Sequence, residues 1–307
     1  MKFIDRVDNV YVVDTNMLGF DHFNAAYIVE GEKIALIDCG LSNQTEAVFA
    51  GIKAHGFSIS DLSYLILTHE HGDHSGNTTP ILRENPKINV YISPAAETAL
   101  LDPVASRKKE TTMPPQMRSR FGEMEPVPRS RIRYLSDGEE LDLGNGEKLK
   151  IMITPGHQPG GIVIHAKKSN GLFVDDIVGL NLPDTGSTFM FTPPGSDIRL
   201  AMQSLKKFKD IPVARYYLGH FGIWNDPKEI MQRAMGHIQW LLDMGAQCVR
   251  EGKPEEIESR FLEHFLPEAE KIKGKRPQGF YEYISKELLV HLSKNFTRYY
   301  TELYQNQ

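Results

Sequence analysis

The sequence predicts a mixed α/β (α+β) protein: a four-layer αββα sandwich followed by a helical C-terminal extension. Short apolar runs bounded by turn residues, typical of strands, dominate the chain to about residue 225, and helical segments lie between some of them. Groups able to bind a metal follow several of these runs, at the position where strands end. The remaining residues have helical spacing almost to the C-terminus, so we expect sheets and helices to pack in layers.

The expected strands are the apolar runs, taken in chain order. They lie within residues 10–14, 25–31, 33–40, 62–68, 88–93, 132–135, 139–144, 148–154, 161–166, 171–176 and 215–220. Segments 44–57 and 197–210 carry apolar residues at helical spacing, and we expect helices there.

Two segments interrupt this pattern, and we expect both to cover the mouth of a site. Residues 94–130 are rich in charge, Pro and Met, which indicates an inserted cover segment. Within it, Met113, Met117 and Met124 are expected to be packing residues. Residues 179–195 contain several Gly and Pro residues and are expected to form a loop.

The C-terminal extension, residues 227–307, is predicted to be helical. We expect helices over 227–252, near 254–266 and near 277–303, the first opening with Pro and closing with Gly. Three helices make a small core, so their apolar faces should dock on the sandwich and cover the pocket. A surplus of aromatic residues would serve a homodimer, the commonest symmetric assembly. These residues are Trp240, Phe296, Tyr299 and Tyr300.

The composition argues against several classes of protein. The 307 residues carry a net charge of −5 and have a pI near 6.1, which argues against a nucleic-acid-binding surface. No apolar run approaches the ~18 residues that span a membrane. The N-terminus shows no export signal, so we expect a cytoplasmic protein with a small-molecule substrate. Cys39 and Cys248 are expected to be buried thiols rather than a disulfide.

The stretch THEHGDHSG, residues 68–76, follows one of the expected strands. Side chains two apart in an extended segment point the same way, so His69 and His71 can converge on one cation. Gly72 permits a sharp turn, after which Asp73 and His74 face elsewhere and can serve a second cation. Imidazoles with a carboxylate suit zinc, iron, manganese or cobalt.

Further ligands are expected at three other strand ends. His157 follows a strand through Pro-Gly, Asp175 and Asp176 end a second run, and His220 ends a third. Ligands at successive strand ends line one edge of a sheet, where the backbone is fixed and side chains can meet. The histidines outside this constellation are treated as structural, apart from His22. They are His55, His165, His237, His264 and His291.

With these residues identified, the chain resembles the metallo-β-lactamase fold superfamily over residues 1 to about 225. The resemblance rests on His-x-His-x-Asp-His at 69–74, the later His157, an Asp after a strand and Gly-His at 219–220. The early strand end LIDCG, which contains Asp38, also matches. The resemblance implies the αββα fold with its metal site at one edge, between the sheets.

The resemblance also implies a role for each candidate ligand. His69, His71 and His157 would hold one metal, Asp73, His74 and His220 would hold the other, and Asp176 would bridge the two. The family has Gly where this chain has Asp175, and we expect Asp175 to face away from the site because neighbours in an extended segment point to opposite faces. Asp38 is expected to contact a metal ligand from behind and to orient it. His22 lies on a loop that borders the active site in the family, so it is expected to line the pocket.

A two-metal site predicts a metal-dependent hydrolase, with residues 1–226 as its catalytic domain. Two cations roughly 3.5–4 Å apart can hold a bridging hydroxide at neutral pH, and one of them polarises the scissile bond. Asp73 is expected to orient the nucleophile or to help a proton depart. We expect two divalent ions, zinc first, with iron or manganese as alternatives.

The residues near the metal-bearing strand ends indicate an apolar or acyl-bearing ester, thioester or lactone as substrate. The expected pocket residues are Phe23, Phe189, Met190, Phe191 and Trp224. Two alternatives stay open. One is a phosphodiesterase-type hydrolase, which would require a basic face, and the other is a mono-iron oxidoreductase similar to sulfur dioxygenases, because zinc and iron share these ligands.

Overall fold

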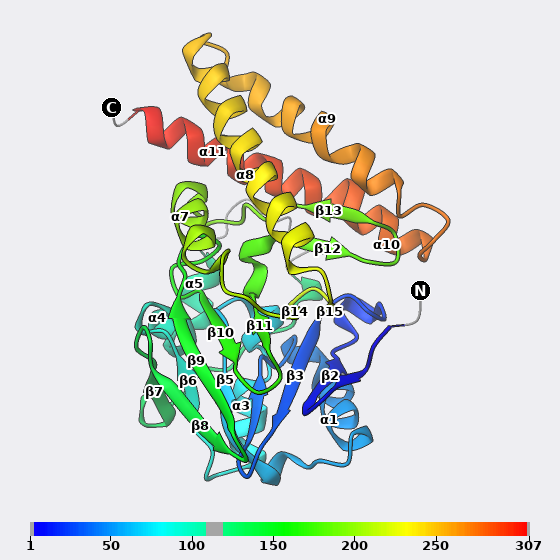
Figure 1. Cartoon of the computed structure of the whole chain (residues 1–307). Helices are drawn as coiled ribbons and strands as arrows, with labels where there is room; N and C mark the ends of the chain where they lie inside the picture. Colours follow the sequence, from blue (N-terminus) through cyan, green and yellow to red (C-terminus); the bar gives the residue numbers. More distant parts are fainter. Residues whose placement is uncertain (1–2, 109–118, 306–307) are drawn as a thin grey trace.

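The computed structural model describes residues 3–108 and 119–305, and it has the four-layer architecture that the sequence predicts. Two mixed sheets face each other, helices cover their outer surfaces, and the C-terminal helices lie across one end of the sandwich (Figure 1). Part of the predicted cover segment, including Met113 and Met117, lies outside the described residues.

The first sheet has seven strands in sequential order and changes from antiparallel to parallel pairing at β4. Its strands are β1 (Arg6–Val7), β2 (Val10–Asp14), β3 (Ala25–Glu30), β4 (Ile34–Ile37), β5 (Leu62–Ile66), β6 (Val90–Ile92) and β7 (Ile132–Tyr134). Parallel neighbours need crossover segments, and these carry α1 (Thr45–Ala54), α2 (Gly72–Ser75), α3 (Thr78–Glu84), α4 (Glu97–Leu101) and α5 (Pro103–Lys108).

The second sheet has six strands in the order β15-β14-β11-β10-β9-β8. They are β8 (Glu140–Gly144), β9 (Glu147–Ile153), β10 (Ile162–Ala166), β11 (Gly171–Phe173), β14 (Arg215–Leu218) and β15 (Gly222–Trp224). Only β11 and β14 pair in parallel, and their crossover contains the hairpin β12 (Leu180–Leu182) with β13 (Ser187–Phe189) and the helix α7 (Ile198–Phe208). Asp197 begins α7 by accepting hydrogen bonds from two backbone N–H groups of its first turn.

Short helical turns connect other elements of the described residues. They are η1 (Met17–Gly19), η2 (Ser42–Gln44), η3 (Ile59–Asp61), η4 (Pro94–Ala96), η5 (Arg129–Arg131), η6 (Asp175–Val178) and η7 (Pro254–Glu256).

The two-residue period of the strands lets each strand contribute to two cores. In β2, Val10 and Val12 are buried between the sheets, whereas Tyr11 and Val13 pack on the outer face with α1. The inner core joins the facing surfaces of the two sheets, which fixes the edge where their strand ends meet.

The C-terminal extension shares a core with the second sheet rather than forming one of its own. Its helices are α8 (Pro227–Arg250), α9 (Ile257–Glu270), α10 (Gln278–Glu282), the π-helix η8 (Tyr283–Leu288) and α11 (Leu289–Gln305). Their apolar residues join Val163 and Leu172 of the second sheet in one buried cluster. Phe296 and Tyr300 belong to this cluster and are 1% and 2% exposed, so they are not available to a partner as the sequence suggested; the homodimer itself stays a prediction.

The segment 179–195, expected as a loop, contains the β12–β13 hairpin. Each of its strands has only three residues, which is too short a signal to detect in the sequence. The extension supplies its contacts: the Ser187 hydroxyl donates to the carbonyl of Glu268 at 2.8 Å, and the Thr188 N–H donates to the Glu268 carboxylate at 3.0 Å. The hairpin thus depends on residues about eighty positions away.

The expectation for the two cysteines is confirmed. Cys39 and Cys248 are both buried and free. Among residues 3–108 and 119–305, none of the helices combines the length and apolar character needed to cross a bilayer.

We expect Arg276 to anchor the extension. Its guanidinium contacts both carboxylate oxygens of Asp184 at 2.7 and 2.9 Å and donates to the carbonyl of His22 at 3.0 Å, and the Arg276 side chain is only 6% exposed. Removing one partner of a buried ion pair leaves a buried charge, so Arg276→Ala should lower the free energy of unfolding by about 3 kcal/mol in urea denaturation. Lys286→Ala, which breaks an exposed pair with Glu282 in the same extension, should cost about 0.5 kcal/mol or less. Equal effects of the two substitutions would contradict this anchoring role.

Candidate metal centre

The loop after β5 presents the first ligands. The backbone at His71 is extended, with φ −62° and ψ 148°, so His69 and His71 lie on the same side of the chain. The single turn α2 then begins, and the N–H groups of His74 and Ser75 both donate to the carbonyl of His71. This turn redirects Asp73 and His74 away from the first two histidines, as the glycine at position 72 suggested.

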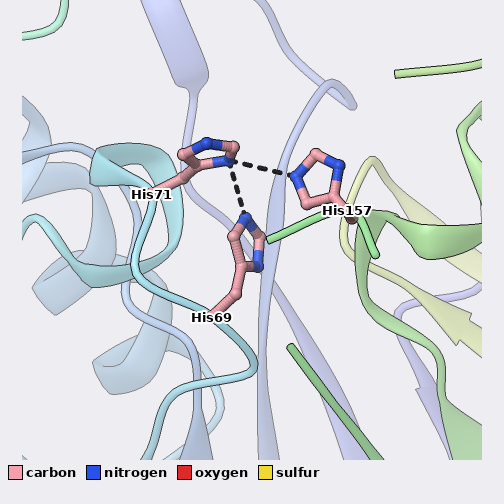
Figure 2. A group of neighbouring side chains, drawn as sticks. All are labelled: His69, His71 and His157. Carbon is pink, nitrogen blue, oxygen red and sulfur yellow. Dashed lines mark hydrogen bonds between the residues drawn. The ribbon is translucent and has the colours of Figure 1, made fainter. Parts of the chain in front are cut away.

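Three histidines form the first group (Figure 2). The Nδ1 atom of His71 lies 3.0 Å from Nε2 of His69 and 3.1 Å from Nε2 of His157. His157 follows β9 through Gly156, where a Cβ atom would lie 2.4 Å from the backbone of Ala201 in α7. A glycine is therefore required for the chain to pass under α7 and to bring His157 to the other two rings.

Four residues form the second group: Asp73, His74, Asp176 and His220, whose ligand atoms all lie within 4.8 Å of one another. The Oδ2 atom of Asp176 is 3.2 Å from Nε2 of His220 and 3.4 Å from Nε2 of His74. It is also 3.7 Å from Nε2 of His157, so this carboxylate lies between the two groups. That is the location the resemblance implied for a bridging ligand.

Each of three histidines is held from behind through its Nδ1 atom. Asp38 contacts Nδ1 of His74 at 2.9 Å, and the carbonyl of Phe23 contacts Nδ1 of His220 at 3.1 Å. Asp175 contacts Nδ1 of His69 at 2.6 Å. Such contacts fix the tautomer and ring orientation, leaving Nε2 to face the site.

Asp175 and Asp176 do not lie in the extended segment that the sequence predicted, although their side chains do diverge. The strand β11 ends at Phe173, and both carboxylates belong to the turn η6. Asp175 adopts a positive φ of 55°, which directs its side chain behind His69 while Asp176 points into the site. A second contact, from the N–H of Asp176 to Asp175 Oδ1 at 2.6 Å, stabilises this strained conformation.

These residues fit a metal by their chemistry. The Nε2 atom of His74 and the Oδ1 atom of Asp176 are buried and have no hydrogen-bond partner among the described residues. Buried polar atoms without partners are rare, because leaving them unsatisfied costs free energy. Imidazole nitrogens and carboxylates are the ligands that zinc and similar divalent ions prefer, and two such groups are consistent with two ions.

The protonation of the two groups differs. Burial lowers the pKa of His71 to about 4 and that of His157 to about 3, so the first group is neutral and able to coordinate. Burial would also lower the pKa of His220, but the carboxylates of Asp176 and Asp73 raise it to about 9. The same carboxylates outweigh burial at His74 and raise its pKa. A cation in the second group would therefore replace protons and take over the pairing with the carboxylates.

The two groups open into a partly open cavity with about 740 Å³ of empty space, part of which is continuous with solvent. Its non-ligand walls are mostly apolar and come from both parts of the chain: Met17, Phe23, Gly72, Phe121, Phe191, Pro193, Pro194, Tyr283, Leu288, His291 and Leu292. The last four lie on η8 and α11, so the extension covers the metal centre. His291, expected from the sequence to be structural, belongs to this wall, and only the amphipathic pattern of the extension could have indicated it.

Of the six predicted pocket residues, Phe23 and Phe191 line this cavity and four do not. Phe189 and Met190 are 1% exposed and pack into the core shared with the extension, because the hairpin turns them inward. His22 stacks on Phe3 with ring centroids 3.9 Å apart. Trp224 belongs to the edge strand β15 and packs against the same core as Phe189.

Comparison with known proteins agrees with this geometry. The family model of the metallo-beta-lactamase superfamily matches residues 19–220, and the chain belongs to this superfamily. It is 28% identical over 200 residues to a Beta-lactamase-like protein 2 homolog of Caenorhabditis elegans, covering 64% of this chain and 55% of the relative. It is 27% identical over 157 residues to Diflavin flavoprotein A 1 of a Synechocystis strain, covering 51% of this chain and 23% of that protein. The chain thus spans about half, or less, of the length of these relatives.

Solved structures show the same fold. A metallo-beta-lactamase family protein from Thermus thermophilus superposes with a TM-score of 0.67 at 16% identity, covering 98% of this chain and 95% of that one. An archaeal superfamily protein from Sulfolobus tokodaii superposes with a TM-score of 0.61 at 24% identity, covering 77% of this chain and 87% of that one. The first match therefore includes the C-terminal helices as well as the sandwich.

Asp175 and Asp176 should differ in metal content when each is replaced. Asp176→Ala removes a carboxylate that lies between both groups, so we expect the zinc content after reconstitution to fall from about two to one per chain. Asp175→Ala removes only the support behind His69, so we expect two ions with 10–100-fold weaker affinity at the first group, the usual effect of such a loss. Elemental analysis and competition with a zinc chelator measure both quantities. If Asp175→Ala lost an ion and Asp176→Ala retained two, Asp175 rather than Asp176 would be the carboxylate shared by the two groups.

Removal of metal should destabilise the protein. Chelation with EDTA leaves the clustered imidazoles and carboxylates with only each other as partners, so we expect a lower melting temperature that two equivalents of zinc restore. His165→Ala, outside both groups on β10, should leave the size of this metal-dependent shift unchanged. His220→Ala should reduce it. A melting temperature that is independent of metal in the unsubstituted protein would argue against a metal centre.

Proposed function

We propose that this chain is a hydrolase of ester, thioester or lactone bonds that uses two divalent metal ions, with zinc as first choice and iron or manganese as alternatives. The observation that carries the proposal is the location of two metal-binding groups at the base of a cavity with mostly apolar walls. The first group would hold one ion through His69, His71 and His157. The second would hold the other through Asp73, His74 and His220, with Asp176 shared.

The chemistry divides between the ions and the protein. When bound, a pair of divalent ions lowers the pKa of a water to near neutrality and polarises the scissile bond. Asp73 lines the cavity, and its Oδ2 atom lies 3.4 Å from Nε2 of His220 and 3.6 Å from Nε2 of His74. From there its carboxylate can orient an attacking water and accept its proton. The apolar walls exclude bulk water and hold the acyl part of the substrate.

The cavity also bears on the two alternatives. No lysine or arginine is among the described residues that line it, whereas a phosphodiester would require positive charge near its phosphate. A mono-iron oxidoreductase similar to sulfur dioxygenases would need only one group of ligands, and this chain has a second group of four. Both observations favour the two-metal hydrolase.

An activity panel tests the proposed function. Purified protein reconstituted with zinc, manganese or iron would be assayed with p-nitrophenyl esters, acyl thioesters, lactones and bis(p-nitrophenyl) phosphate. We expect metal-dependent turnover of acyl substrates and at least 100-fold lower kcat/KM for the phosphodiester. Oxygen consumption with a persulfide substrate provides the test of the mono-iron alternative. Turnover of only the phosphodiester, or only oxygen consumption, would refute the proposal.

The apolar wall should control the preference for acyl chain length. The Phe191 ring lies 5.8 Å from that of His157 and 5.0 Å from that of His220, between the two groups. Phe191→Ala should lower kcat/KM for p-nitrophenyl octanoate by about 10-fold or more relative to the acetate, because the longer chain loses more apolar contact. Phe57→Ala deletes an equal side chain from the opposite outer core and should leave that ratio unchanged. An unchanged ratio in Phe191→Ala would place the acyl group elsewhere.

A further inference from the structure

The π-helix η8 brings an additional hydroxyl group to the metal centre. Residues five apart in an α-helix point about 140° away from each other, because each residue turns about 100°. In a π-helix, hydrogen bonds join residues five apart, so these residues stack on the same face. Tyr283 and Leu288, the first and last residues of η8, accordingly both line the cavity above the metal-binding groups. An unbroken α-helix would direct one of them elsewhere.

Tyr283 is fixed in this location by packing on several sides. It is 2% exposed, and its ring makes an edge contact with Phe23, with centroids 5.8 Å apart. Phe23 in turn lies 5.3 Å from the ring of His220, so Tyr283 is on the side of the second group. The guanidinium of Arg120 lies 5.2 Å from the Tyr283 ring centroid and bonds both carboxylate oxygens of Glu287 in η8.

The hydroxyl of Tyr283 is available to a ligand. It has no hydrogen-bond partner among residues 3–108 and 119–305. Buried tyrosines usually find a partner, as Tyr27 does with the carbonyls of Leu218 and Gly222. Burial, with a contribution from the Asp73 carboxylate, raises the pKa of Tyr283, so the phenol stays protonated and can only be a donor to an anionic group.

We propose that Tyr283 is a catalytic residue whose hydroxyl donates a hydrogen bond to the acyl oxygen of the substrate as that oxygen becomes negatively charged. This inference rests on the proposed function. A water oxygen bonds to the acyl carbon while its proton passes to Asp73, and the electron pair of the C=O π bond moves to the acyl oxygen. Tyr283 stabilises this oxygen without giving up its proton. The electron pair on the acyl oxygen then re-forms the C=O π bond, and the bond between the acyl carbon and the leaving group breaks. The leaving group departs with the electrons of that bond and takes the proton from Asp73.

Tyr283→Phe in the full chain tests this role. Since one donor to an oxyanion contributes about 100-fold or more, we expect kcat for p-nitrophenyl hexanoate to fall about 100-fold with KM changed less than 2-fold. The loss should be the same for aryl esters with good and poor leaving groups. Metal content and melting temperature should match the unsubstituted protein. The matched control is Tyr281→Phe, which removes a hydroxyl that bonds Glu270 on the surface of the same extension and should leave all values unchanged.

Binding of n-hexylphosphonate, a tetrahedral anion, separates this inference from the proposed function. Calorimetry should show at least 10-fold weaker binding to Tyr283→Phe than to the unsubstituted protein. If turnover and phosphonate binding of Tyr283→Phe both stay within 2-fold of the unsubstituted protein, Tyr283 does not stabilise the acyl oxygen. A loss that grows with leaving-group pKa would assign the hydroxyl to the leaving group and overturn the acyl-oxygen assignment. If the unsubstituted protein hydrolyses no acyl substrate, the proposed function fails. The comparison of phosphonate binding still tests the role of Tyr283 in that case. If neither protein binds the phosphonate, the inference about Tyr283 is refuted.

Discussion

The carboxylate of Asp38 is the contact on which the geometry of the metal centre depends. One of its oxygens accepts the N–H of Thr68 at 2.8 Å, and the other contacts the Thr68 hydroxyl at 2.7 Å and Nδ1 of His74 at 2.9 Å. The N–H of Cys39 adds a bond to the carbonyl of His74 at 2.7 Å. The end of β4 thereby holds both ends of the ligand-bearing loop, and Asp38 orients His74 of the second group directly.

The remaining ligands reach this loop because the two sheets share an inner core. Facing side chains of both sheets are buried between them, which sets the distance from the end of β5 to the ends of β9, β11 and β14. Close approaches limit the residues allowed there: a Cβ atom on Gly219 would lie 2.8 Å from His74 and 2.9 Å from Asp176. The Gly-His pair at 219–220 is therefore a packing requirement of the centre as well as a part of the family pattern.

The sandwich and the extension contribute different properties to the cavity. Strand ends provide charged and metal-binding groups on a rigid frame, whereas η8 and α11 add Tyr283, Leu288, His291 and Leu292 to the wall that faces them. Because the extension and the second sheet share one apolar core, the wall is held in place by the same burial that stabilises the fold. Asp175 adds a contact on the sandwich side, because its buried carboxylate supports His69.

The fold class, the location of most strands along the chain and the residues that gather in the two ligand groups could be predicted from the sequence. These features are predictable because they depend on local patterns: the two-residue period of apolar runs, helical spacing, and metal-binding residues directly after strands. Which side chains form the cavity depends on long-range packing. Phe189 and Met190 turn into the core and His291 into the wall, because long-range packing of the extension sets their direction. The turn at Asp175 and the π-helix at Tyr283 could not be predicted from the sequence either. Each is a local backbone conformation that its residues rarely adopt and that surrounding contacts stabilise.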